Sequence, residues 1–196
     1  MTTLCFIDTE TTGLDARIHQ PYEVCWWRED QPKPESAALP HSLNMADGAA
    51  LRIGGYFDRD FRPETDRNDY WVQRLARDLN GVTLVGSNPA FDAAMLTRFI
   101  GTAVWHHRMI NVADGAMWVF DLDRPPGLAQ TVELLAGRGY EIPEPNHTAE
   151  GDVRTTRAVY EALRAIRTPT CPACHHSTDA HGITDVCAVD DCECAR

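Results

Sequence analysis

The feature that most constrains this chain is an apolar segment that runs directly into two carboxylates. Residues Leu4 to Ile7 have the pattern of a buried strand, and Asp8-Thr-Glu10-Thr-Thr-Gly follows at once. Side chains two residues apart on an extended strand project from the same face. Two carboxylates held so close repel each other unless a cation or a proton lies between them. A lone pair of this kind is more often a capping acid beside a solvated turn residue, but α/β sheets also build their sites at such strand ends.

Strand and helix patterns alternate along the chain as far as about residue 167. Apolar, aromatic and β-branched residues predict strands at Tyr22–Trp27, near Ser42–Leu43, at Val82–Val85 and at Met109–Val112. Helical spacing predicts helices over Asn68–Leu79, Phe91–Ile100 and Leu128–Leu135, and one after His147. Three prolines between Asp30 and Pro40 predict a loop. The alternation predicts an α/β domain. The last helix is expected to turn inward Val153, Thr156, Val159, Tyr160 and Leu163.

The length and charge of the chain limit the classes of protein to which it can belong. With 196 residues, the chain is long enough for one ordinary domain and a small appendage. Its 29 acidic and 18 basic residues give a net charge of −11. This balance argues against a module that passively coats nucleic acid, because such a module needs a basic face. It does not exclude a nuclease, because bound divalent cations supply positive charge locally.

The location of the protein is predicted from what the sequence lacks. No apolar run approaches the length that crosses a bilayer. The N-terminal segment lacks the basic region and the small-residue cleavage site of a signal peptide. We therefore expect a cytoplasmic protein that does not associate with a membrane. Cys5 and Cys25 lie in apolar stretches and are expected to be buried, inert thiols.

Two further acidic motifs follow predicted strands and loops. Asp92 comes after the strand that ends at Val85 and the turn Gly86–Pro89, at the start of a helix. Taken alone it is a routine acid of a helix N-terminus, where the macrodipole favours negative charge. His147 ends a proline-rich loop, and Asp152 follows about one helical turn later. Alone, this pair is also unremarkable, since a surface histidine near a carboxylate usually has no function.

Together, and in this order, the three motifs resemble the DEDDh exonuclease superfamily. This RNase H-like group includes the proofreading subunits of bacterial DNA polymerase III, RNase T and oligoribonuclease. The resemblance spans residues 1–167 and implies an α/β fold in which helices flank a mixed central sheet. It includes Glu23 in the second strand and departs at Ser87, where the family usually has a histidine. The motifs that carry it are Asp8-Thr-Glu-Thr-Thr-Gly-Leu14, Asn88-x-x-Phe91-Asp92 and His147-x-Ala149-x-x-Asp152.

The resemblance implies a metal-dependent 3′-5′ exonuclease that releases nucleoside 5′-monophosphates. Its substrate would be the 3′ end of a nucleic acid, with single-stranded DNA favoured over RNA. Two Mg²⁺ or Mn²⁺ ions would be held by Asp8, Glu10, Asp92 and Asp152. His147 would act as the general base, since imidazole changes its protonation near neutral pH. The substrate contacts would come from Thr11, Thr12, Gly13, Leu14, Asn88 and Phe91, with Leu14 between the last two bases.

A separate pattern begins after Thr168-Pro169, where the hydrophobic periodicity ends. We therefore expect an exonuclease domain over residues 1–167 and a Cys/His-rich tail over 168–196. Five of the seven cysteines lie in this tail, which favours one structural Zn²⁺ over disulfides. The alternative is a disordered, redox-sensitive tail. The tail is acidic, so we expect it to have a structural role or to dock a protein partner. The favoured ligands are Cys171, Cys174, Cys187 and Cys192, with His181 or Cys194 as substitutes.

Two other functions are consistent with parts of the sequence. The first is a catalytically silent adaptor that keeps the fold and docks a partner through the tail. The complete set of four carboxylates and one histidine speaks against it. The second is a phosphohydrolase of another fold that uses Asp8 and Glu10 alone. That function leaves the motifs Asn88–Asp92 and His147–Asp152 unexplained.

Overall fold

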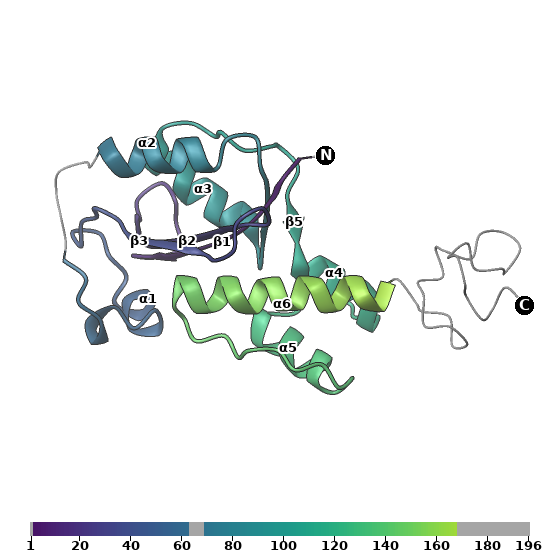
Figure 1. Ribbon diagram of the computed structural model, residues 1–196. Helices are drawn as coiled ribbons and strands as arrows, with labels where there is room; N and C mark the ends of the chain where they lie inside the picture. Colours follow the sequence, from purple (N-terminus) through teal and green to yellow (C-terminus); the bar gives the residue numbers. More distant parts are fainter. Residues whose placement is uncertain (1, 63–68, 168–196) are drawn as a thin grey trace, which may run out of the picture.

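A five-stranded mixed sheet forms the centre of the molecule. The computed structural model describes residues 2–62 and 69–167. The strands lie in the order β3-β2-β1-β4-β5 (Figure 1). The pairs β1–β2 and β2–β3 are antiparallel, whereas β1–β4 and β4–β5 are parallel. The predicted α/β class with a mixed central sheet is therefore confirmed. The strands are β1 (Leu4–Thr11), β2 (Pro21–Arg28), β3 (Glu35–Ala38), β4 (Thr83–Gly86) and β5 (Ile110–Asn111).

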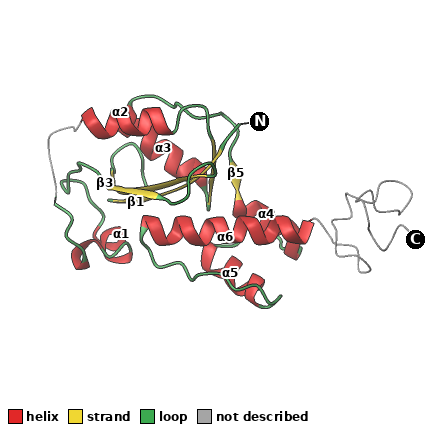
Figure 2. Cartoon of the chain, viewed as in Figure 1, coloured by secondary structure: helices red, strands yellow, loops and turns green. Residues whose placement is uncertain are grey.

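Helices cover both faces of this sheet (Figure 2). The helices α2 (Asp69–Asp78) and α3 (Pro89–Ile100) lie on one face, and Leu75 and Leu96 join Ile7 of β1 in one core. The other face carries α4 (Val112–Phe120), α5 (Leu128–Ala136) and α6 (Ala149–Arg167), and here Phe6 packs with Val153. Because side chains alternate along a strand, this arrangement turns Asp8 and Glu10 toward the face covered by α6.

A small third cluster lies beside the N-terminal end of α6. It is built from α1 (Gly48–Ile53) and the 3-10 helix η1 (Tyr56–Asp58). The aromatic rings of Tyr22 and Tyr56 meet edge-to-face here with centroids 4.9 Å apart. Neither helix was predicted, although Asp47 is a regular N-cap whose side chain accepts a hydrogen bond from the Ala49 amide. Helices of one or two turns are too short to show a clear hydrophobic period.

Two strand predictions differ from the structure. The third strand was expected near Ser42–Leu43 but lies at Glu35–Ala38, inside the predicted loop. The prolines of that loop lie outside these four residues, and the edge position of β3 tolerates prolines beside it. The strand expected at Met109–Val112 is limited to two residues, because Asn111 caps α4 by accepting a hydrogen bond from the Ala113 amide.

The remaining helix predictions agree with the structure within two residues. The predicted helix from Phe91 begins earlier, at Pro89, whose fixed φ suits the first turn. The predicted inner face of α6 is buried at four of its five positions, and Tyr160 is half-buried. Within the described ranges, no helix is long and apolar enough to cross a membrane. The tail 168–196 and its predicted zinc ligands lie outside the described residues.

Candidate active site

Two carboxylates of the first motif lie side by side on the same face of β1. Asp8 and Glu10 occur late in the strand, after its buried apolar part. In the antiparallel register with β2, Glu10 lies directly opposite Glu23. Like charges opposite each other destabilise a sheet, so this end of β1 and β2 concentrates an unfavourable negative charge.

The third motif completes an acidic cluster. Asp152 lies in the first turn of α6, and α6 crosses one face of the sheet (Figure 1). One carboxylate oxygen of each of these three residues lies within 4.8 Å of the other two. Asp152 is more than 140 positions away from Asp8 and Glu10 in the sequence, and the packing of α6 on β1 and β2 brings it to them.

Asp92 stands beside this cluster and is held differently. It lies in the first turn of α3 and is buried. Its Oδ1 accepts hydrogen bonds from the backbone amide of Thr9 at 2.9 Å and from the Thr9 hydroxyl at 2.7 Å. Thr9 lies between Asp8 and Glu10, and the charge of Asp92 acts on Asp8. All four predicted carboxylates therefore lie near the C-terminal end of β1. Asp8, Glu10 and Asp152 are close together, and Asp92 lies next to them on α3, hydrogen-bonded to Thr9.

Burial and mutual repulsion make this cluster unstable as a set of bare anions. Burial raises the pKa of Asp8 well above its usual range, and the neighbouring Asp92, Asp152 and Glu10 raise it further. Burial and the same kind of repulsion raise the pKa of Glu10 to about 8. Protons or cations must therefore offset the charge at neutral pH. A set of carboxylate oxygens suits hard divalent cations such as Mg²⁺ or Mn²⁺, so the residues present fit the predicted metals.

His147 lies in the loop that leads into α6, and its side chain is exposed. Its backbone is left-handed with φ of 55°, which is uncommon for a residue other than glycine. The loop is tied to the helix, because the Asn146 amide donates to Asp152 Oδ1 at 2.9 Å. The Thr148 hydroxyl in turn accepts a hydrogen bond from the Gly151 amide at 3.0 Å. These contacts present the imidazole to solvent close to Asp152. Burial raises the pKa of the Asp152 carboxylate, and a positive charge on His147 acts against this rise.

The six predicted substrate contacts divide into exposed and enclosed groups. Leu14 is 79% exposed, and Asn88 is exposed with a left-handed backbone. The hydroxyls of Thr11 and Thr12 are buried and form hydrogen bonds within their own loop, to Gly13 O and from the Gln20 amide. Their side chains therefore shape the loop. Phe91 is half-buried in α3, and Gly13 is buried against the ring of His19.

Further residues around the cluster were not predicted from the sequence. Gly54 follows α1 and lies so close to the site that a Cβ atom there would approach Glu10 Oε2 within 2.8 Å. Arg59 follows η1 and forms an ion pair with Glu23 at 2.7 Å. Neither position carries a local signal in the sequence, because its partners are distant along the chain. Exposed apolar side chains also occur on the segments that flank Glu10, and these are Leu14, Ile18, Met45, Ile53 and Phe57.

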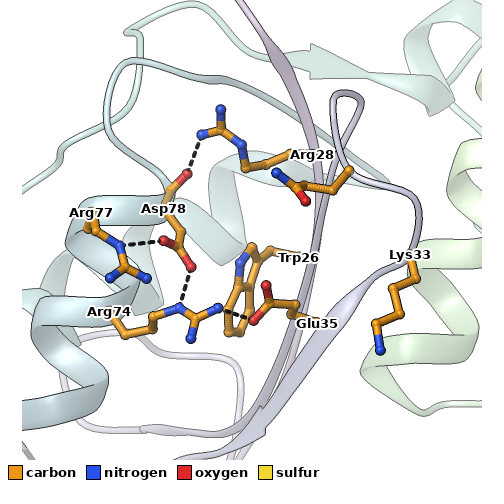
Figure 3. A pocket seen from close by; sticks show the side chains of 8 residues that line it. Trp26, Arg28, Lys33, Glu35, Arg74, Arg77 and Asp78 are labelled. Atoms are coloured by element: carbon orange, nitrogen blue, oxygen red, sulfur yellow. Dashed lines mark hydrogen bonds and ion pairs between the residues drawn. The ribbon is translucent and has the colours of Figure 1, made fainter.

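A second charged cavity lies on the other face of the sheet, between α2 and the β2–β3 hairpin (Figure 3). Its arginines already have acidic partners. Asp78 accepts from Arg74 at 2.5 Å and from Arg77 at 2.9 Å, and its backbone carbonyl accepts from Arg28. Arg74 also pairs with Glu35. The charges of this cavity are thus largely neutralised within the protein, and the cluster ties α2 to the hairpin.

The fold and the acidic cluster together define an RNase H-like domain, and solved structures with this fold are known. A zinc-bound complex of E. coli exonuclease I with single-stranded DNA matches with a TM-score of 0.64 and 19% sequence identity, over 86% of this chain and 41% of that chain. The complex of the same E. coli enzyme with a dA16 oligonucleotide matches with a TM-score of 0.66 and 17% identity, over 86% and 42%. A product-bound exonuclease I matches with a TM-score of 0.63 and 18% identity, over 84% and 44%.

This chain is therefore similar in fold to exonuclease I and spans less than half the length of those exonuclease chains. Identities this low show the shared fold alone. The predicted RNase H-like fold is confirmed at this level. No protein-family model matches the sequence, and no curated protein matches it either.

Proposed function

We propose that this protein is a metal-dependent 3′-5′ exonuclease that shortens nucleic acids from their 3′ ends. The observation that carries the proposal is the convergence of Asp8, Glu10 and Asp152 within 4.8 Å, with buried Asp92 behind them. This cluster occurs in a fold shared with exonuclease I, whose structures contain single-stranded DNA. The same fold argues against a phosphohydrolase of another architecture.

The proposed chemistry assigns different roles to the residues of the cluster. Asp8, Glu10, Asp92 and Asp152 would be the ligands of two Mg²⁺ or Mn²⁺ ions. Bound there, the ions supply positive charge against the carboxylates and against the charge that develops on the phosphodiester. His147 would take the proton of the attacking water, for which its exposed imidazole beside Asp152 is suited. The product would be a nucleoside 5′-monophosphate.

The surroundings of the cluster favour unpaired bases as the substrate. The segments that carry Leu14 and Met45 are joined by a hydrogen bond from the Asp47 amide to the Thr12 carbonyl at 2.7 Å. Their exposed apolar side chains, together with the exposed ring of Phe57, can pack against bases. Packing of this kind does not depend on the base sequence, but it requires bases that are free of a complementary strand. We therefore propose single-stranded DNA as the preferred substrate, with RNA as a second one.

The decisive experiment is the substitution Asp8→Asn. It removes a proposed metal ligand and a negative charge while it keeps the side-chain volume. We expect the rate at which 5′-labelled single-stranded DNA is shortened to fall by at least about 10²-fold. Asp123→Asn, at an exposed position, serves as the control and should retain full activity. RNA and duplex DNA of matched sequence, assayed in parallel, determine the preferred substrate.

Two outcomes would contradict the proposal. Activity of Asp8→Asn within about tenfold of the wild type would remove this residue from the catalytic set. Binding of oligonucleotides by the wild-type protein without any metal-dependent cleavage would instead indicate the silent adaptor.

We also propose that the protein is cytoplasmic, that the tail over residues 168–196 binds zinc, and that this tail has a protein partner.

A further inference from the structure

Arg59 connects three parts of the chain that surround the acidic cluster. Its Nη1 donates to Glu23 Oε2 at 2.7 Å. Its Nη2 donates to the carbonyl of Gly54 and, at 3.5 Å, to the carbonyl of His147. One guanidinium therefore contacts β2, the residue that follows α1, and the loop that carries the proposed general base.

Each of these acceptors is itself linked to the site. Glu23 lies opposite Glu10, and its Oε2 also accepts from the Ala149 amide at 3.3 Å, at the first residue of α6. The Gly54 carbonyl also accepts from the Tyr22 hydroxyl at 3.2 Å, and Gly54 approaches Glu10 closely. Arg59 thus stabilises the start of α6 in two ways. It donates directly to the carbonyl of His147, and it pairs with Glu23, which accepts from the amide of Ala149.

The environment of Arg59 makes its ion pair with Glu23 stronger than a surface ion pair. The side chains of Arg59 and Glu23 are 25% and 14% exposed, so water screens their charges only in part. The guanidinium also lies 4.6 Å from the centroid of the Phe61 ring. Its Nε is buried without an acceptor in the described part of the chain, which costs free energy. The contacts of the two Nη atoms must offset this cost for the side chain to stay in place.

We propose that Arg59 is a positioning residue for His147. The planar guanidinium donates in fixed directions, so that it can hold the loop of His147, the start of α6 and Gly54 in one arrangement. Without it, the loop loses one hydrogen bond at its carbonyl, and Glu23 loses the partner that orients it toward Ala149. The inference rests on the proposed function, because it assigns Arg59 a role through the proposed general base.

A double-mutant cycle on activity tests this role. Arg59→Met removes the donors and keeps much of the volume. If Arg59 acts through His147, the substitution should lower kcat by about 10–100-fold in the wild type, with KM within about threefold. In a His147→Ala background, the same substitution should change kcat by less than about threefold. Arg62→Met is the matched control, because Arg62 is exposed and pairs only with exposed Asp60 among the described residues.

Other outcomes of this cycle would overturn the proposal. Equal losses in both backgrounds would show that Arg59 does not act through His147. A rise in KM in both backgrounds would indicate a substrate contact instead. Full activity of Arg59→Lys would show that the positive charge suffices, because a single ammonium group cannot reach the three acceptors in the same geometry.

Hydrogen exchange of the backbone amides provides a readout that does not depend on nuclease activity. The amides of residues 146–152 should exchange about tenfold faster in the full-length Arg59→Met protein than in the wild type or in Arg62→Met. The Ala149 amide, whose acceptor is Glu23, should be among those affected. Unchanged exchange would refute the positioning role whatever the activity shows. If the wild type cleaves no nucleic acid, the proposed function fails, but the exchange still decides whether Arg59 holds this loop.

Discussion

At the scale of single residues, the four carboxylates of the proposed site are held in different ways. Asp92 accepts two hydrogen bonds from Thr9, and Asp152 accepts one from the Asn146 amide. Within the described part of the chain, no donor forms a hydrogen bond with the side-chain carboxylate of Asp8 or Glu10. The two carboxylates of the first motif are therefore the ones whose charge depends most on a proton or a cation.

This difference leads to a prediction about pH and stability in the absence of divalent metal. In the unfolded chain, carboxyl groups titrate near pH 4. In the folded, metal-free protein, burial raises the pKa of Asp8 and raises that of Glu10 to about 8. The folded state therefore binds more protons than the unfolded state between about pH 4 and pH 8. The free energy of unfolding should fall as the pH rises through this window.

Urea unfolding in EDTA, measured at several values between about pH 5 and pH 8, checks this prediction. Asp8→Asn should flatten the dependence, because it removes one of the repelling charges. Mg²⁺ or Mn²⁺ should stabilise the wild type most at the upper end of the window. Carboxylates in ion pairs, such as Asp78, titrate below this range and do not obscure the effect. A metal-free protein that becomes more stable as the pH rises would contradict the assigned charges.

At the scale of elements, the charged cavity between α2 and the β2–β3 hairpin has a structural role. Burial alone would raise the pKa of Asp78, but Arg74 and Arg77 hold it below its usual range. The Asp78 side chain is only 14% exposed. Ionised Asp78, paired with two arginines, therefore stabilises the folded state at neutral pH. This stabilisation is lost as the pH falls through the lowered pKa of Asp78.

We therefore predict that Asp78→Asn lowers the free energy of unfolding by about 1–3 kcal/mol at neutral pH. The nuclease activity should remain, because the cavity and the acidic cluster lie on opposite faces of the sheet. Asp60→Asn is the control, since Asp60 is 84% exposed and its loss should cost less than about 0.5 kcal/mol. Denaturant unfolding of both variants measures the difference. An Asp78→Asn protein as stable as the wild type would show that the arginines find other partners.

At the scale of the whole molecule, the sheet topology determines where the site lies. The first strand is in the centre of the sheet, with an antiparallel partner on one side and a parallel one on the other. Helices α3 and α6 start near its C-terminal end, so that Asp92 and Asp152 in their first turns reach the carboxylates of β1. The described domain contains the complete proposed catalytic set.

From this we predict that residues 1–167 form a separable nuclease. The segment 168–196 has five cysteines and no hydrophobic periodicity, so that only metal coordination could offset its ordering entropy. A protein that ends at Arg167 should keep its activity on short oligonucleotides within about threefold and lose stoichiometric zinc. Elemental analysis of the reduced full-length protein and of the truncated one checks both points. Zinc-free full-length protein, or a folded but inactive truncated one, would show the division to be wrong.

The elements that the sequence predicted well are those with a strong local pattern. The strands β1, β2 and β4 each contain a short run of apolar, aromatic or β-branched residues, and α3 and α6 have clear helical spacing. The edge strand β3 consists of small and polar residues beside prolines, so its strand conformation depends on pairing with β2. The helix α4 was missed because its apolar residues are not confined to one face, and the short α1 shows no period.

The sequence by itself determined which residue types follow the apolar strands, and hence the three motifs with their acids and the histidine. Only the tertiary structure decided that Asp8, Glu10 and Asp152 share one cluster and that Asp92 is held behind it by Thr9. It alone also revealed Arg59, whose partners Glu23 and His147 are 36 and 88 residues away. The physical reason is that strand and helix patterns arise from neighbouring residues. Contacts between distant segments arise from how the sheet and its helices pack.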